Sequence, residues 1–185
     1  MPAKFTDPLK EAERRISEWI RFRFDFAPID FSGLGLSSLP ARLFTLKPLR
    51  SLNLARNKFI ELPEELGTLE NLNSLDVRKT QLESLPDSLA GLRLFHSLQA
   101  ENNRLRSLPT PFFMPGAMPA LESLYLRGNP ALGIPDSVLG PTWIEAVTNR
   151  DNSASPASIL NYYFEHRLMT PTPPNEGETF TRSSV

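Results

Sequence analysis

The 185-residue sequence predicts an α/β repeat solenoid with a parallel sheet on its concave face and a helical cap at each end. Three observations support this prediction. Apolar residues recur with a spacing of 23 residues, each repeat contains a short stretch in which every second residue is apolar, and a proline follows each stretch at a constant offset. A unit of this length cannot bury its own apolar residues, so consecutive units must stack on one another.

Residues 1–25 are expected to form a helix that caps the N-terminal end of the array. Asp7 suits the N-cap position and Pro8 the first helical position. One helical face is apolar, and the other carries charges of both signs. The apolar residues are Leu9, Ala12, Ile16, Trp19 and Ile20. An amphipathic membrane anchor is the alternative, and it fits less well because the polar face of such an anchor is mainly basic.

The repeat is clearest in two adjacent segments, 49–71 and 72–94. When these are aligned, apolar positions and one proline coincide. Leu49, Leu52, Leu54, Phe59, Leu62, Leu66 and Leu69 fall on Leu72, Leu75, Val77, Leu82, Leu85, Leu89 and Leu92, and Pro63 falls on Pro86. The same register extends over 26–48 and over 95–120, which has three additional residues, and a fifth unit begins at Leu121. We therefore expect five repeats within 26–141.

Each repeat is expected to contribute one short strand. The alternating apolar pairs point to one side of the strand and hence into the core. The pairs are Leu52 and Leu54, Leu75 and Val77, Leu98 and Ala100, and Leu124 and Leu126. Because the units repeat in one direction, the strands pair in parallel, and the residues between the apolar ones face outward on the concave side.

An asparagine follows the strand in three of the repeats, at Asn57, Asn103 and Asn129. We expect an asparagine ladder, in which each buried amide bonds loop backbone groups that would otherwise be unpaired, at a cost of about 1–3 kcal/mol each. Leu34 and Thr80 interrupt this ladder. A Leu-Pro or Ile-Pro pair then begins the convex return of each repeat, where the fixed φ of proline suits an extended or helical turn.

The insertion in the fourth repeat leaves Phe113 and Met114 as a surplus apolar pair. Packing beneath a convex loop is favoured over exposure, because two residues are too few to define an interaction patch.

Residues 142–169 are expected to form a helical cap at the other end. A short helical piece presents Trp143 and Ile144, and after a polar loop a second helix opens at Ser155 and Pro156. The expected sealing face of that helix consists of Ile159, Leu160, Tyr163 and Phe164. Residues 170–185 have too little apolar content to fold and are expected to be a disordered tail.

The pattern LxxLxLxxNxLxxLPxxLxxLxx over 26–141 resembles the leucine-rich repeat, which implies a horseshoe that binds proteins. The segments 128–143 (GNPALGIPDSVLGPTW), 157–164 (ASILNYYF) and 29–40 (IDFSGLGLSSLP) are similar to the repeat array of bacterial Roco-type proteins. In that family the array precedes a GTPase domain with a signalling role. No GxxxxGK[ST] loop follows here, so no residue is assigned to nucleotide binding. Two alternatives stay open: a shortened array, or a fragment of a larger protein.

Composition restricts the function further. The net charge of -1 gives no basis for nucleic-acid binding. Cysteine is absent, which excludes disulfides, thiolate metal sites and ubiquitin ligases with a catalytic cysteine. The two histidines lie near no recognisable nucleophile or ligand set, so we expect no enzyme activity, no metal and no cofactor. Without a signal-peptide or membrane-spanning pattern, the expected location is cytoplasmic and the expected state monomeric.

The predicted binding residues are the outward columns of the concave sheet and its strand edges. They are Arg50, Asn53, Arg56, Asp76, Arg78, Lys79, Gln99, Glu101, Tyr125 and Arg127. One interpretation is a docking surface for a partner protein, with Tyr125 and the arginines as anchors. The other is a solvated charge ladder of little energetic value. For a single residue the ladder is favoured, and for the face as a whole binding is favoured.

Overall fold

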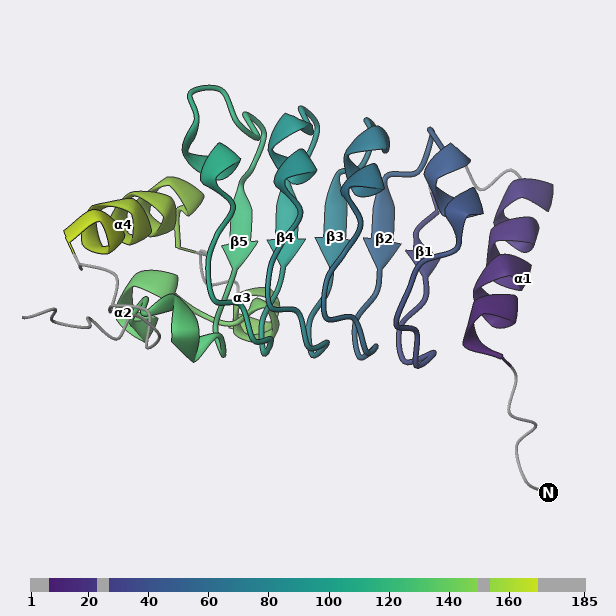
Figure 1. Ribbon diagram of the computed structural model, residues 1–185, viewed down its shortest axis with the longest axis horizontal. Coiled ribbons are helices and arrows are strands. Elements are labelled where there is room, and N and C mark those ends of the chain that lie inside the picture. The colour runs from purple at the N-terminus through teal and green to yellow at the C-terminus, as the bar shows by residue number, and fades with distance from the viewer. Residues whose placement is uncertain (1–6, 23–26, 150–153, 170–185) are drawn as a thin grey trace, which may run out of the picture.

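The computed structural model describes residues 7–22, 27–149 and 154–169. Short parallel strands form one five-stranded sheet in chain order (Figure 1). They are β1 (Ile29–Asp30), β2 (Ser51–Asn53), β3 (Ser74–Asp76), β4 (Ser97–Gln99) and β5 (Ser123–Tyr125). The predicted α/β repeat solenoid with its parallel sheet is thereby confirmed.

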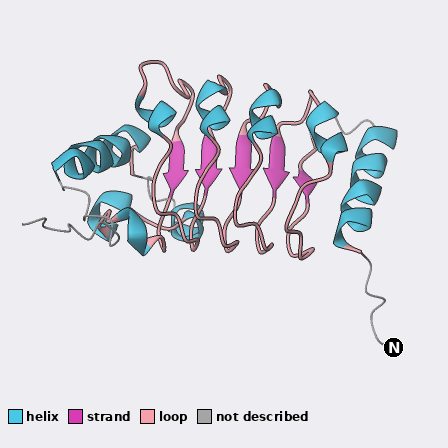
Figure 2. Ribbon diagram, in the orientation of Figure 1, coloured by secondary structure: helices cyan, strands magenta, loops and turns pink. Residues whose placement is uncertain are grey.

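A row of 3-10 helices returns the chain beside the row of strands (Figure 2). These are η1 (Ala41–Thr45), η2 (Glu64–Thr68), η3 (Asp87–Gly91), η4 (Thr110–Phe113) and η5 (Pro130–Leu132). Proline precedes η1 to η4, with φ between -73° and -57° and an extended ψ. Its ring fixes φ near this value, so the residue ends the extended segment and begins the turn at little entropic cost.

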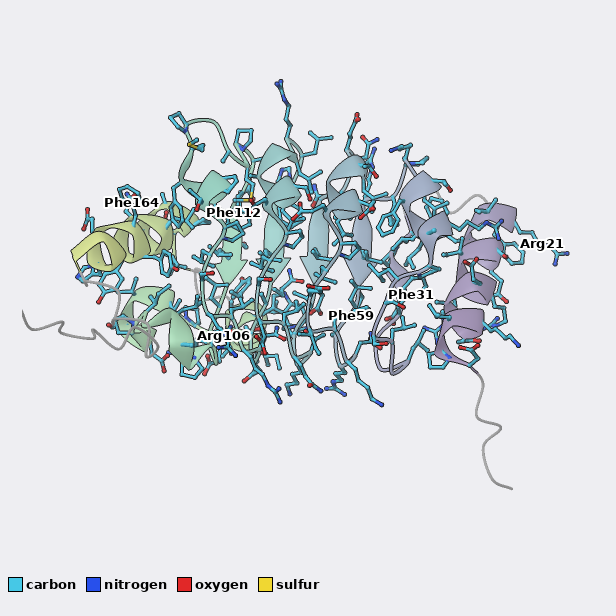
Figure 3. The ribbon with its side chains drawn as sticks, viewed as in Figure 1. Arg21, Phe31, Phe59, Arg106, Phe112 and Phe164 are labelled. Carbon is cyan, nitrogen blue, oxygen red and sulfur yellow. The ribbon has the colours of Figure 1, made fainter. Side chains whose placement is uncertain are left out.

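The strand register reproduces the repeat found in the sequence. Ser51 pairs with Ser74, and Ser74 with Ser97, at intervals of 23 residues. Ser97 pairs with Ser123, so the three additional residues of the fourth repeat lie outside the strands. The strand leucines are almost completely buried, and Phe31, Phe59 and Phe95 are the bulkiest fully buried side chains. Figure 3 shows Phe31 and Phe59 within neighbouring repeats.

The three asparagines after the strands are buried and bond the backbone of two repeats. Asn57 Oδ1 accepts hydrogen bonds from the amides of Gly35 and Leu36 at 2.9 and 3.0 Å. Its Nδ2 donates to the carbonyls of Phe31 and Leu54, both at 2.8 Å. Asn103 and Asn129 bond equivalent groups.

Thr80, which replaces asparagine in the third repeat, still takes part in this network. Its Oγ1 lies 2.6 Å from Asn103 Oδ1 and 3.1 Å from the Val77 carbonyl oxygen. The hydroxyl is shorter than an amide, so it contacts the next asparagine of the ladder instead of the loop before it.

Helix α1 (Pro8–Arg21) packs against the β1 end of the array (Figure 1). Asp7 accepts a hydrogen bond from the Leu9 amide, and the indole of Trp19 donates to the Ala27 carbonyl. Ala12, Ile16 and Trp19 are buried. Leu9 and Ile20 remain 41% and 40% exposed, so the buried face is narrower than predicted. The remainder of 1–25 lies largely outside the described residues.

Three further helices lie at the β5 end (Figure 1). They are α2 (Asp136–Leu139), α3 (Trp143–Asn149) and α4 (Pro156–Met169). Ile159 and Tyr163 of α4 are buried, and Tyr163 Oη accepts a hydrogen bond from the Leu108 amide at 3.2 Å. Phe164 is 49% exposed, which corrects the prediction of one sealing face. The predicted tail, 170–185, lies outside the described residues.

Phe113 and Met114, the surplus apolar pair of the fourth repeat, lie in different environments, one packed and the other exposed. Phe113 stacks on Tyr163 with ring centroids 5.7 Å apart, because the insertion brings η4 against α4. Met114 is 63% exposed. The prediction that both pack beneath a loop is therefore wrong for Met114.

Candidate protein-binding face

Three columns of side chains run across the concave side of the sheet. One column contains the strand serines, the second contains Asn53, Asp76, Gln99 and Tyr125, and the third contains Ala55, Arg78, Glu101 and Arg127. They alternate with buried leucines along each strand, as the period of a strand requires. We call these three columns, together with the strand-edge residues Arg50, Arg56 and Lys79, the concave face.

Helix α3 lies against the third column of this face. The Trp143 amide donates a hydrogen bond to Glu101 Oε1 at 3.1 Å. The guanidinium carbon of Arg78 lies 4.0 Å from the centre of the Trp143 ring, within the range of a cation–π contact. Arg127 approaches Glu145 at 3.6 Å. We call this set of contacts the α3 clasp, and it means that the chain covers part of its own concave face.

Four of the predicted binding residues consequently have little surface. Asp76, Gln99, Glu101 and Tyr125 are all less than 10% exposed. Arg78 bends back over Asp76, with a 2.6 Å contact between Nη2 and Oδ2, and Gln99 donates to Ser97 Oγ. The expectation that the outward columns are open to a partner is therefore wrong for these four residues.

The partial burial of Glu101 affects its charge. Desolvation raises the pKa of this carboxyl, and the hydrogen bond from Trp143 and the attraction of Arg78 oppose that rise. Arg78 donates hydrogen bonds to the Asp76 carboxylate, and these bonds raise the pKa of the guanidinium. In Glu145, hydrogen bonds from the backbone and hydroxyl of Thr142 lower the pKa. The clasp therefore favours the charged forms of Arg78 and Glu145, whereas burial disfavours the charged form of Glu101.

The other predicted residues remain accessible. Arg50, Arg56 and Lys79 are exposed, whereas Asn53, Arg78 and Arg127 are half-buried. Arg56 and Lys79 occupy the turn that leaves the strand, with left-handed φ angles of 59° and 55°. That turn conformation aims both side chains past the edge of the sheet, next to α3.

A pocket of about 140 Å³ lies between these turns and α3. Its lining residues are Ala55, Arg56, Arg78, Lys79, Glu101, Asn102, Thr142 and Ile144. Three of them are cations and one is an acid. We call it the clasp pocket.

Sequence reasoning missed the role of Trp143. It identified a helical piece that presents this side chain but assigned it to the end of the array, not to the concave face. The pertinent signal was a tryptophan in a short segment outside the repeats, because this large side chain usually requires a partner surface. No periodicity specifies which surface that is.

The described residues contain no group of acidic or histidine side chains that could hold a metal ion. His96 Nδ1 contacts the Leu94 carbonyl and the Asn73 side chain. Within the described ranges, no helix has the length and apolar character needed to cross a membrane.

Comparison with known proteins agrees with this architecture. The Leucine Rich Repeat family model matches residues 48–69. No curated protein matches the sequence. A leucine-rich-repeat protein of Leptospira interrogans superposes with a TM-score of 0.51 and 27% identity, over 62% of this chain and 34% of that protein. The chain thus spans about a third of the length of that relative.

Two further structures share the repeat with lower scores. YopM from Yersinia enterocolitica has a TM-score of 0.46 and 27% identity, over 65% of this chain and 28% of its own. The leucine-rich-repeat domain of the type III effector XopL has a TM-score of 0.43 and 27% identity, over 60% and 47%.

Proposed function

We propose that this chain, a leucine-rich-repeat solenoid, is a non-catalytic module that binds a partner protein on its concave face. The observation that carries the proposal is the uncovered part of that face, where Arg50, Asn53, Arg56 and Lys79 stand on adjacent repeats. A partner lodged there meets side chains from several repeats at once. The rigid sheet beneath them keeps the entropic cost of binding low.

The proposed contact residues are thus a subset of those predicted from the sequence. Arg50, Asn53, Arg56 and Lys79 contact the partner directly. The remaining predicted residues hold α3 in place or support the floor of the face, because they are covered or paired within the chain. Tyr125, once expected to be an anchor, is only 7% exposed and belongs to the floor.

The test is a pull-down with the purified chain, followed by mapping with charge-reversal variants. Arg56→Glu with Lys79→Glu should weaken capture of the identified partner at least about tenfold, since charged anchors near the centre of an interface carry much of its energy. Lys10→Glu with Arg93→Glu is the matched control, because it makes the same change of net charge outside the concave face. Equal losses in the two variants would contradict the proposed surface.

A second candidate is that the chain is the repeat part of a Roco-type GTPase with a role in signalling. It rests on the resemblance of 128–143 and 157–164, the segments that form α2, the start of α3 and much of α4. The chain by itself is expected to bind neither GTP nor GDP in calorimetry. Micromolar binding would show a nucleotide site that the sequence motif does not account for.

Ubiquitin-ligase activity is a further alternative. Incubation with ubiquitin, E1 and E2 tests it directly, and ubiquitin conjugates that depend on this chain would replace the non-catalytic assignment.

A further inference from the structure

The clasp pocket is the feature of the concave face with the most distinctive chemistry. Arg56 and Lys79 form one wall, and each has no carboxylate within ion-pair distance among the described residues. Both side chains are exposed. Unpaired cations beside a low-dielectric wall attract an anion more strongly than isolated surface cations do.

The acidic residue of the lining is not available to pair with Arg56 or Lys79. Glu101 is 3% exposed, and its Oε1 is bonded to the Trp143 amide. Arg78 is held against Asp76 by two hydrogen bonds and lies over the Trp143 ring. The charges that remain accessible to a ligand are therefore those of Arg56 and Lys79.

The lining also includes an exposed aliphatic side chain. Ile144 of α3 lines the pocket and is 58% exposed, and Val147, one helical turn further on, is 61% exposed. Positions three apart lie on the same side of a helix. Two accessible cations and one aliphatic side chain therefore line the same small space.

The size of the pocket restricts its ligand. Cofactors and drug-sized molecules occupy pockets of about 300–1,000 Å³, and this one measures about 140 Å³. A single side chain fits, with its neighbours along a peptide lying outside.

We propose that the clasp pocket binds an acidic segment of the partner protein. One glutamate or aspartate of that segment lies between Arg56 and Lys79, and an adjacent aliphatic residue packs on Ile144. This inference deepens the proposed concave-face function and rests on it. Charge complementarity favours a peptide over the phosphates of a nucleic acid, because the pocket also offers aliphatic surface, and the net charge of the chain is -1.

The test uses fluorescein-labelled peptides with a Glu-Leu-Glu core between glycine-serine spacers, measured by anisotropy with the full chain. Matched peptides carry Gln-Leu-Gln or Glu-Ser-Glu. The Glu-Leu-Glu peptide should bind at least about tenfold more tightly than the Gln-Leu-Gln peptide at low salt. This preference should shrink as ionic strength rises from about 0.05 to about 0.5 M, because exposed ion pairs are screened.

Two variants assign the binding to this pocket. Arg56→Gln with Lys79→Gln should abolish the preference for glutamate, whereas Lys10→Gln with Arg93→Gln should retain it. Ile144→Ser should reduce the preference of the chain for leucine over serine in the peptide core. Thermal unfolding of each variant checks that the fold is intact, and an unfolded variant is replaced by the single substitutions Arg56→Gln and Lys79→Gln.

The inference is overturned if the glutamate and glutamine peptides bind equally, or if the pocket variant and its control behave alike. It is also overturned if a fluorescein-labelled single-stranded oligonucleotide binds more tightly than the acidic peptide. Failure of the proposed function would differ from these results: an identified partner would then map to the convex side, whatever the peptides do. If capture of the partner depends on Arg56 and Lys79 while acidic peptides do not bind, the concave function stands and this inference falls.

Discussion

The buried asparagines are the residues on which the turns of the array depend most directly. Asn57 connects two repeats, because its amide bonds four backbone groups that no other side chain reaches. The same groups would be buried and unpaired without it. A small polar side chain therefore has a larger effect on stability here than its size indicates.

Asn57→Ala should lower the free energy of unfolding by at least about 2 kcal/mol, since several buried hydrogen bonds lose their partner together. Urea denaturation followed by circular dichroism measures this loss. Asn71→Ala is the matched control, because that amide bonds the Lys47 carbonyl in an exposed position. Similar losses in the two variants would show that the buried bonds contribute no more than a surface bond.

Glu101 is a second residue whose effect on stability follows from its surroundings. Burial raises its pKa above the ordinary value of 4.5, so the folded chain holds this proton more tightly than the unfolded chain. The contribution of Glu101 to stability is therefore fully present below the unfolded pKa and is lost as pH rises through the folded pKa.

Glu101→Gln keeps an acceptor for the Trp143 amide but removes the charge. The variant should gain stability relative to the native chain as pH rises from below the ordinary glutamate pKa of 4.5 through the raised folded-state pKa, where the native carboxylate becomes ionised. Urea denaturation across this range measures the difference, with Glu65→Gln as a control for loss of one exposed carboxylate. A difference that stays constant or falls as pH rises would contradict the assigned direction.

At the level of elements, successive repeats are joined by a capping contact on the convex side. Glu64, at the start of η2, accepts hydrogen bonds from the amides of Asp87 and Ser88 at 3.0 and 2.8 Å. These amides belong to the first turn of η3, which has no side-chain cap of its own. One repeat thus supplies the cap for the next.

Close packing accompanies this contact. A Cβ atom on Gly67 would lie 2.5 Å from the Ser88 Cβ, so only glycine fits at this point between η2 and η3. Because Gly67 has no side chain, η2 and η3 can approach each other closely. The Glu64 cap lies beside this point of closest approach.

Glu64→Ala should therefore destabilise the chain by about 1 kcal/mol, the usual value of a lost N-terminal cap. Hydrogen bonds from the backbone of Ser88 lower the pKa of Glu64, so its contribution is present above the ordinary pKa of 4.5 and is lost as pH falls through the lowered value. Urea denaturation near neutral pH and in acid tests both statements. Glu65→Ala, its exposed neighbour, should have little effect at either pH, and an equal loss from Glu65→Ala would rule out capping as the cause.

Across the full array, one core extends from α1 to α4. Buried residues of both caps and of every repeat belong to the same apolar cluster. Leu75 lies at the centre of this cluster and is fully buried. Short units that share one core and have both ends covered should unfold together.

Leu75→Ala should lower the free energy of unfolding by about 2–5 kcal/mol, because it leaves a cavity in the centre of the array. A loss below about 1 kcal/mol would mean that the core is not continuous there.

Cooperativity can be measured separately, because the two tryptophans report on the N-terminal helix and on the α3 clasp. Trp19 lies in α1, and Trp143 lies in the α3 clasp. Trp19→Phe and Trp143→Phe each leave one fluorescent reporter, and both should give the same denaturation midpoint as circular dichroism once the effect of each substitution on stability is included. Separate transitions for fluorescence and circular dichroism would show that one end unfolds independently.

The sequence was sufficient to predict the structure of the repeats. The period of 23 residues fixed the strand register, and the position of Leu52 and Leu54 within the unit fixed which side chains enter the core. The reason is physical: each unit must bury its leucines against its neighbours, so the stacking distance leaves one consistent register. The asparagine positions followed from the same constraint, because a buried turn requires hydrogen-bond partners.

The covering of the concave face was decided by the tertiary structure alone. The hydrogen bond between Trp143 and Glu101 joins residues 42 positions apart, and the segment around Trp143 has no repeating pattern that could indicate its partner. A non-repeating segment docks wherever its particular side chains find complementary ones, here a buried carboxylate and the face of a guanidinium. For this reason the sequence predicted the outward columns but not which of their residues, such as Arg56 and Lys79, would remain open to a partner.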